Sequence, residues 1–125
     1  MSSAAALEAD PRGRILLVED EEVVRDVVTM MLEQHGFEVV AVEDALAALS
    51  ACRNGESFDL LLTDLVMPSM NGVELAAAVR EQAPSTRVVY MSGYSAEDVV
   101  DSNPRVQKPF TSAELLDTLQ QTLAA

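Results

Sequence analysis

The chain is poor in basic, aromatic and sulfhydryl side chains. Its 125 residues contain 8 Lys and Arg against 21 Asp and Glu, for a formal net charge of -13, and only 4% are aromatic. Nucleic acids are bound through basic surfaces, so we expect no direct nucleic-acid binding. The single Cys52 excludes an internal disulfide and a cysteine zinc site. No stretch approaches the roughly 18 consecutive apolar residues of a membrane span, so we expect an acidic, cytoplasmic protein without membrane insertion.

Hydrophobic residues make up 49% of the chain, which is long enough for one domain with its own core. Residues 1–12 are rich in Ala and acidic or small side chains, without the basic start and long apolar core of a signal peptide. We therefore expect a flexible tail over residues 1–12 and one folded domain over residues 13–125.

Short apolar runs alternate with helical patterns five times along this domain. The expected strands are 14–18, 37–42, 60–64, 87–91 and 105–107, and the expected helices are 22–35, 44–53, 72–82, a short one at 96–100, and a last one that follows the T-x-x-E capping box of Thr111 and Glu114. Parallel strands need crossover connections, which helices provide. The pattern therefore predicts an α/β fold with a parallel sheet covered by helices on both faces.

Two of the expected helices carry distinct apolar patterns. On the helix at 22–35, apolar residues cover an arc of about 200°, whereas a helix facing one sheet needs a stripe of about 100° or a little more. This excess is either generous coverage of the core or an exposed apolar flank that docks a partner. On the helix at 44–53, the residues expected to face inward are Ala45, Leu46, Ala48, Leu49 and Cys52.

Polar side chains follow four of the five expected strands. Glu19 and Asp20 follow the first, Asp64 ends the third, Ser92 follows the fourth, and Lys108 follows the fifth. In an open parallel sheet the carboxyl ends of the strands lie along one edge, where ligands bind. We therefore expect these side chains to lie together.

Three clustered carboxylates repel one another unless a cation lies among them. Mg²⁺, or Mn²⁺ in its place, suits such oxygen ligands. With the metal present, an Asp64 oxygen is able to attack a phosphoryl group and form an aspartyl phosphate. Lys108 and the Ser92 hydroxyl are placed to stabilise the phosphoryl oxygens.

These motifs resemble the response-regulator receiver domain of two-component signalling. The resemblance covers nearly all of the chain from Arg14 onward and is carried by Ile15-Leu16-Leu17-Val18-Glu19-Asp20-Glu21, Leu62-Thr63-Asp64-Leu65-Val66-Met67-Pro68 with Met70-Asn71-Gly72, Met91-Ser92-Gly93-Tyr94, and Gln107-Lys108-Pro109-Phe110. The sequences of the last two motifs resemble those of receivers attached to hybrid sensor histidine kinases.

The resemblance implies a flavodoxin-like (βα)5 fold with strand order 2-1-3-4-5. It also implies a phosphorelay domain, not an enzyme, that takes a phosphoryl group onto Asp64 from a histidine kinase or histidine phosphotransfer domain, with Mg²⁺-dependent self-phosphorylation and self-dephosphorylation. Glu19 and Asp20 would be the acidic metal pocket, with Asp20 the direct ligand, and Val66 would add its backbone carbonyl. Ser92 would be the hydroxyl of the switch and Lys108 the lysine of the family, with a cis peptide bond before Pro109.

The chain departs from the family pattern in two places. Arg105 stands where receivers commonly carry Tyr or Phe, three residues before the lysine, and the segment from Tyr94 to Arg105 is several residues shorter than is typical. A shortened fourth helix and a missing aromatic switch predict an atypical output through the face formed by the fourth helix, fifth strand and fifth helix. Strong amide shifts across residues 96–105 on beryllofluoride binding would contradict this prediction.

Three rival functions are weighed against the receiver. A haloacid-dehalogenase-like phosphatase needs a second Asp two residues after the nucleophile, where this chain has Val66. A flavodoxin needs a phosphate-binding loop after the first strand, where residues 19–22 are all acidic and would repel phosphate. A degenerate receiver that only binds partners would not need Asp64 and Lys108. A stand-alone receiver and a piece of a longer hybrid kinase both fit the sequence.

Overall fold

The described residues form a five-stranded parallel sheet. The computed structural model describes residues 12–93 and 102–124. The strands are β1 (Arg14–Val18), β2 (Glu38–Val42), β3 (Leu60–Asp64), β4 (Arg87–Ser92) and β5 (Arg105–Gln107). They pair in the order β2-β1-β3-β4-β5, as the sequence predicts. β4 runs one residue further than expected, to Ser92, and β2 begins one residue later.

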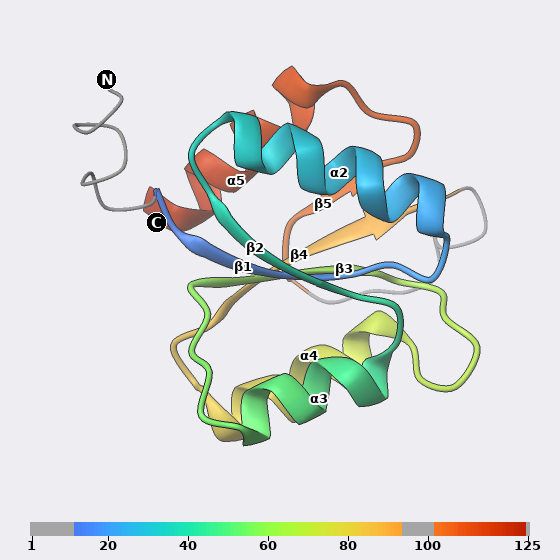
Figure 1. Ribbon diagram of the computed structural model, residues 1–125, viewed down its shortest axis with the longest axis vertical. Coiled ribbons are helices and arrows are strands. Elements are labelled where there is room, and N and C mark those ends of the chain that lie inside the picture. Colours follow the sequence, from blue (N-terminus) through green and yellow to red (C-terminus); the bar gives the residue numbers. More distant parts are fainter. Residues whose placement is uncertain (1–11, 94–101, 125) are drawn as a thin grey trace.

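Helices cover both faces of the sheet (Figure 1). They are α2 (Glu22–Gln34), α3 (Ala45–Arg53), α4 (Gly72–Gln82) and α5 (Ser112–Ala124). α2 and α5 lie on one face, and α3 and α4 lie on the other. The short helix expected at 96–100 lies outside the described residues. None of the helices described is long and apolar enough to cross a membrane.

The two faces of the sheet make two separate cores because successive side chains of a strand point to opposite sides. In β1, Leu16 packs towards α3 and α4, whereas Ile15 and Leu17 pack towards α2 and α5. β1 and β3 are the central strands and, apart from the half-buried Arg14, every residue in them is buried. This explains why the two strands are continuous apolar runs: neither face meets water.

Side chains at the helix ends fix where the helices begin. Asp44 accepts the Ala47 N–H at the start of α3, and Asn71 and Glu74 form a reciprocal capping box at the start of α4. The box predicted for Thr111 and Glu114 is confirmed: each side chain accepts a hydrogen bond from the backbone N–H of the other residue. These bonds satisfy N–H groups that have no partner inside the helix.

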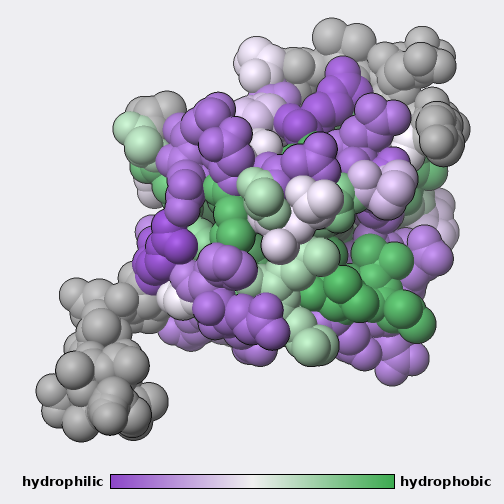
Figure 2. Space-filling view, turned by 90° about the horizontal axis from the view of Figure 1, so that it is seen from above, coloured by the Kyte–Doolittle hydropathy of each residue, from purple (hydrophilic) through white to green (hydrophobic). Residues whose placement is uncertain are grey.

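An exposed apolar flank is present on α2. The side chains of Val23, Val27 and Met30 are 75%, 45% and 58% exposed, while Val28 and Leu32 of the same helix are buried. Figure 2, seen onto the face covered by α2 and α5, shows a continuous hydrophobic area bordered by hydrophilic side chains. The prediction of a generously covered core helix is therefore wrong, and the exposed flank is confirmed.

One residue expected in the core lies on the surface. Leu46 was expected to face inward, yet it is 69% exposed, whereas Ala45, Ala48 and Leu49 are buried as predicted and Cys52 is half-buried. The buried positions of α3 are completed by Ala51. The helix therefore packs along a narrow stripe of mainly small side chains, and Leu46 lies outside it.

Candidate functional site

The carboxyl ends of four strands bring the predicted side chains to one edge of the sheet. Glu19 and Asp20 follow β1, Asp64 and Ser92 end β3 and β4, and Lys108 follows β5. β1 and β4 both pair with β3, so Asp64 lies between the ends of its two neighbours. The parallel topology thus creates this cluster from residues as much as 89 positions apart in the chain.

Lys108 links two of the carboxylates. Its Nζ donates to Glu19 Oε1 at 2.7 Å and to Asp64 Oδ2 at 3.0 Å. The Glu19 side chain is fully buried, and those of Asp64 and Lys108 are 11% and 22% exposed. Ion pairs with so little solvent around them are screened far less than surface pairs. The ammonium group therefore partly neutralises an otherwise strongly acidic cluster.

The environment of the cluster raises the pKa of both Glu19 and Lys108. Burial raises the pKa of Glu19 above its usual range, and this outweighs the hydrogen bonds from Lys108 and from the Glu21 N–H. Burial also acts to lower the pKa of Lys108, but its hydrogen bonds to Glu19 and Asp64 outweigh burial, so the pKa of Lys108 is raised. The ammonium group therefore stays charged across the physiological range.

Glu19, Asp20 and Asp64 are suited to hold a hard divalent cation. One carboxylate oxygen from each lies within 4.8 Å of the others. Both oxygens of Glu19 already accept protein hydrogen bonds, Oε1 from Lys108 and Oε2 from the Glu21 N–H at 3.1 Å. Asp20, by contrast, is exposed to solvent. An all-oxygen donor set with one solvent-facing carboxylate matches Mg²⁺, which retains several of its waters.

The other predicted site residues surround this acidic cluster. Ser92 is buried at the end of β4, and its backbone carbonyl accepts a hydrogen bond from the Lys108 N–H at 2.7 Å. Val66, two residues after Asp64, is 54% exposed. The peptide bond between Lys108 and Pro109 is cis, as predicted.

Two contacts near the site were not predicted from the sequence, although Gly72 belongs to the motif Met70-Asn71-Gly72. Arg25 of α2 donates from Nη1 to the backbone carbonyl of Glu19 at 3.0 Å. Gly72, the first residue of α4, lies against the backbone of Asp64 and Leu65. Neither contact leaves a local pattern in the sequence, because both join a helix to the loop at the end of a strand.

Replacing Gly72 with Ala is expected to lower the free energy of unfolding by about 1–3 kcal/mol, the usual cost of overpacking a buried position. A Cβ at Gly72 would lie 2.5 Å from the Asp64 backbone oxygen and 3.1 Å from the Leu65 Cα, so the backbone would have to shift. Urea unfolding measures this loss. The matched control is Gly93→Ala, where a Cβ meets nothing within 4 Å; equal stability of the two variants would contradict the prediction.

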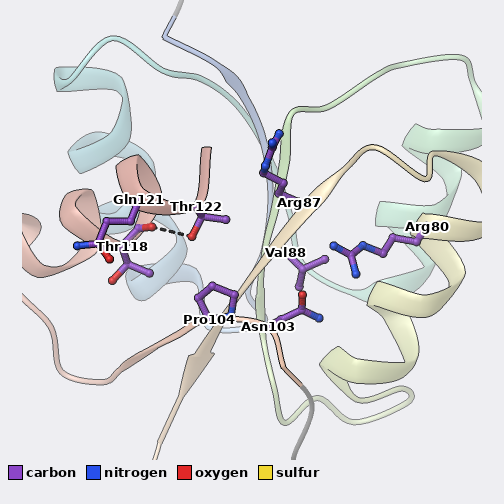
Figure 3. Close-up of a pocket in the computed structure, with 8 residues that line it drawn as sticks. All are labelled: Arg80, Arg87, Val88, Asn103, Pro104, Thr118, Gln121 and Thr122. Atoms are coloured by element: carbon purple, nitrogen blue, oxygen red, sulfur yellow. Dashed lines mark hydrogen bonds between the residues drawn. The ribbon is translucent and has the colours of Figure 1, made fainter. Parts of the chain in front are cut away.

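A hollow of about 380 Å³ lies away from this site. It is lined by the first two residues of β4, Arg87 and Val88, and by residues of the second half of α5. Figure 3 shows Arg80 reaching from α4 towards Val88 and Asn103. The hollow is at the opposite end of β4 from Ser92 and contains none of the three carboxylates, so it plays no part in the acidic cluster.

Comparison with known proteins agrees with this geometry. The family model described as the response regulator receiver domain matches residues 15–120. The response regulator receiver protein CpdR of Brucella abortus is 35% identical, over 90% of this chain and 98% of its own length. The chain spans about half the length of two cyanobacterial transcriptional regulatory proteins that it also matches, at 51% and 48%.

Solved structures give the same result. A response regulator receiver protein from Sinorhizobium medicae is similar with a TM-score of 0.81 and 32% identity, over 95% of this chain and 98% of that chain. The receiver domain of the hybrid histidine kinase CckA is similar with a TM-score of 0.77 and 31% identity, over 89% and 99% of the two chains.

Proposed function

This chain belongs to the response regulator receiver domain family of two-component signalling, and on that premise we propose that Asp64 is its phosphoacceptor. The observation that carries the proposal is the contact of Asp64 with Lys108 beside two further carboxylates, at the carboxyl edge of the sheet. Family members interact with histidine kinases, and the donor of the phosphoryl group is here a histidine kinase or a histidine phosphotransfer domain.

Mg²⁺, or Mn²⁺ in its place, would be held by Asp20, Asp64 and the Val66 backbone carbonyl, beside Glu19. Glu19 would contribute its negative charge to the metal pocket, and both of its carboxylate oxygens already accept hydrogen bonds from protein groups. When bound, the cation neutralises the negative charge that phosphoryl oxygens bring to an acidic pocket. The all-oxygen donor set supports this assignment.

In the reaction, an Asp64 carboxylate oxygen forms a bond to phosphorus. The bond from phosphorus to the donor breaks, and its electron pair leaves with the histidine nitrogen or, with a small-molecule donor, with the acetate oxygen. Lys108 Nζ exchanges its hydrogen bond with Asp64 Oδ2 for one with a phosphoryl oxygen. The Ser92 hydroxyl donates to a second oxygen. Aspartyl phosphate returns to the free carboxylate by hydrolysis, so the domain undergoes a cycle without acting as an enzyme on a separate substrate.

The phosphodonor docks on the apolar flank of α2. A hollow of about 480 Å³ is lined by Val23, Val24, Val27, Val28 and Met31 of α2 and by Gly93, Lys108, Pro109 and Phe110. Lys108 therefore belongs both to this apolar hollow and to the acidic cluster. A partner seated on α2 would bring its phosphohistidine to the edge where Asp64 lies.

Charge on the α2 flank is expected to slow transfer from a protein donor but not from acetyl phosphate. Val27→Asp places a carboxylate in the hollow, and we expect transfer from the kinase to fall by about tenfold or more, because a buried unpaired charge costs several kcal/mol at an interface. The control is Leu46→Asp, an apolar position on the opposite face of the sheet that is also exposed, at 69% against 45% for Val27. Equal transfer to both variants would contradict docking on α2.

The output of the domain is atypical, because Arg105 begins β5 where receivers commonly carry an aromatic residue. Arg105 is exposed and lies beside Tyr90 in the register of β4 and β5. Residues 96–100, where the sequence predicts a short helix, lie outside the described part of the chain, so this prediction depends on the sequence and on Arg105. The domain functions in the cytoplasm, where histidine kinases present their phosphohistidine.

The proposal is tested by intact-mass spectrometry of the protein incubated with acetyl phosphate and Mg²⁺. We expect the protein to gain one phosphoryl mass. This gain should not occur when EDTA is added before the donor. No gain with acetyl phosphate or with a histidine kinase would overturn the proposal in favour of a receiver that only binds partners.

A further inference from the structure

Arg25 is a charged residue of α2 whose side chain is turned towards the acidic cluster. Its Nη1 donates to the backbone carbonyl of Glu19 at 3.0 Å, in a partly buried contact. Its backbone N–H donates to the Glu21 carbonyl at 2.9 Å. One residue thus holds both ends of the turn that carries Asp20.

Within the described part of the chain, the other hydrogen bonds that hold the turn run through Glu19. The Glu19 N–H donates to the Val42 carbonyl at 3.1 Å, and the Glu19 carboxylate binds Lys108 and the Glu21 N–H. These bonds fix the nitrogen and the side chain of Glu19. The plane of the peptide bond from Glu19 to Asp20 is fixed by Arg25, because Arg25 binds the oxygen of that same peptide bond.

We propose that Arg25 is a positioning residue for the metal site: by holding the Glu19 carbonyl, its guanidinium group orients the Asp20 carboxylate towards Asp64. The inference rests on the metal site proposed above. It adds a residue whose side chain binds the Glu19 backbone, from the helix whose apolar flank is proposed to receive the phosphodonor. Mutation of groups that orient metal ligands typically lowers metal affinity or activity by about 10- to 100-fold.

The sign of the effect separates positioning from simple charge. Arg25 is a positive charge close to a cation site, so its removal should tighten Mg²⁺ binding if only long-range electrostatics acted. Loss of positioning has the opposite effect, because Asp20 is exposed and its orientation would no longer be fixed. Loss of the positive charge alone would strengthen Mg²⁺ binding. Weaker Mg²⁺ binding by Arg25→Ala would therefore indicate loss of positioning.

The test is isothermal titration of the full chain with Mg²⁺, without phosphodonor. We expect Arg25→Ala to bind Mg²⁺ about tenfold more weakly than wild type, within the usual effect of residues that orient ligands. The control is Asp26→Ala, the next residue of α2, which is exposed and whose loss should change affinity less than about twofold through a screened charge. If Arg25→Ala does not fold, Arg25→Met keeps the aliphatic stem and is measured in its place.

A second readout is the rate of phosphorylation by acetyl phosphate at increasing Mg²⁺. The Mg²⁺ concentration for half-maximal rate should rise about tenfold, and the rate at saturating Mg²⁺ should approach that of wild type. Unchanged or tighter Mg²⁺ binding, or a rate that stays low at saturating Mg²⁺, would overturn the inference. Absence of Mg²⁺ binding by wild type would instead refute the proposed metal site itself.

Discussion

Asp64→Asn is expected to abolish the gain of a phosphoryl mass on incubation with acetyl phosphate and Mg²⁺. The amide is close in size to the carboxylate but is not a nucleophile at neutral pH, so no bond to phosphorus forms. The buried position and the contact with Lys108 make Asp64 the only carboxylate of the cluster that both ends a central strand and binds the lysine. Intact-mass spectrometry over a time course measures the loss.

The control is Asp26→Asn, which removes an exposed carboxylate from α2 and leaves the acidic cluster intact. This variant should gain the phosphoryl group as wild type does. Circular dichroism should show that Asp64→Asn stays folded, since the change removes a like charge that acts to raise the pKa of Glu19. Continued phosphorylation of Asp64→Asn would place the acceptor at another residue.

Lys108→Ala is expected to lower the free energy of unfolding by about 3 kcal/mol in buffer without divalent cations, because it leaves a buried carboxylate uncompensated. Glu19 is fully buried, and its ion pair with Lys108 is 2.7 Å long. Added Mg²⁺ should restore much of the lost stability, since binding to the folded state alone stabilises it. Phosphorylation should fall by about 100-fold, the usual loss when one stabilising donor is removed.

Urea unfolding followed by circular dichroism measures the stability, since the chain has no tryptophan to report by fluorescence. Arg53→Ala is the control: it removes one positive charge from the exposed end of α3, and we expect a loss below about 1 kcal/mol. Lys108→Ala with the stability of wild type in the presence of EDTA would contradict the proposed role of the lysine in neutralising the cluster.

The strands were within reach of the sequence because both faces of the inner strands are buried, whereas the strand order was implied by the family resemblance. Such strands read as continuous apolar runs, and their alternation with helices leaves few topologies. The misplaced residue, Leu46, shows the limit of this reasoning. Helical periodicity gave its position on α3, but the width of the stripe that the sheet covers depends on how closely the helix approaches, which small residues such as Ala48 and Ala51 decide.

The exposed flank of α2 was left open by the sequence for a similar reason. An apolar arc of about 200° has two explanations, and only the packing of neighbours distinguishes them. In the fold, α2 and α5 lie on the same face of the sheet, and Val28 and Leu32 belong to the buried cluster on that face, whereas Val23 and Val27 are exposed. The apolar arc of α2 is therefore wider than the part of the helix that the buried cluster covers.

The sequence by itself determined the α/β fold, the strand order through its family resemblance, and the side chains at the end of each strand. It did so because burial and strand direction are written locally, in apolar runs and in the residues that stop them. Only the tertiary structure decided how those side chains meet: that Lys108 binds Glu19 and Asp64 together, that Gly72 touches the Asp64 backbone, and that Arg25 holds the Glu19 carbonyl. Lys108 is 89 and 44 residues from its two partners, so those contacts follow from the packing of the whole sheet, and the two shorter-range contacts follow from how α2 and α4 pack at its edge.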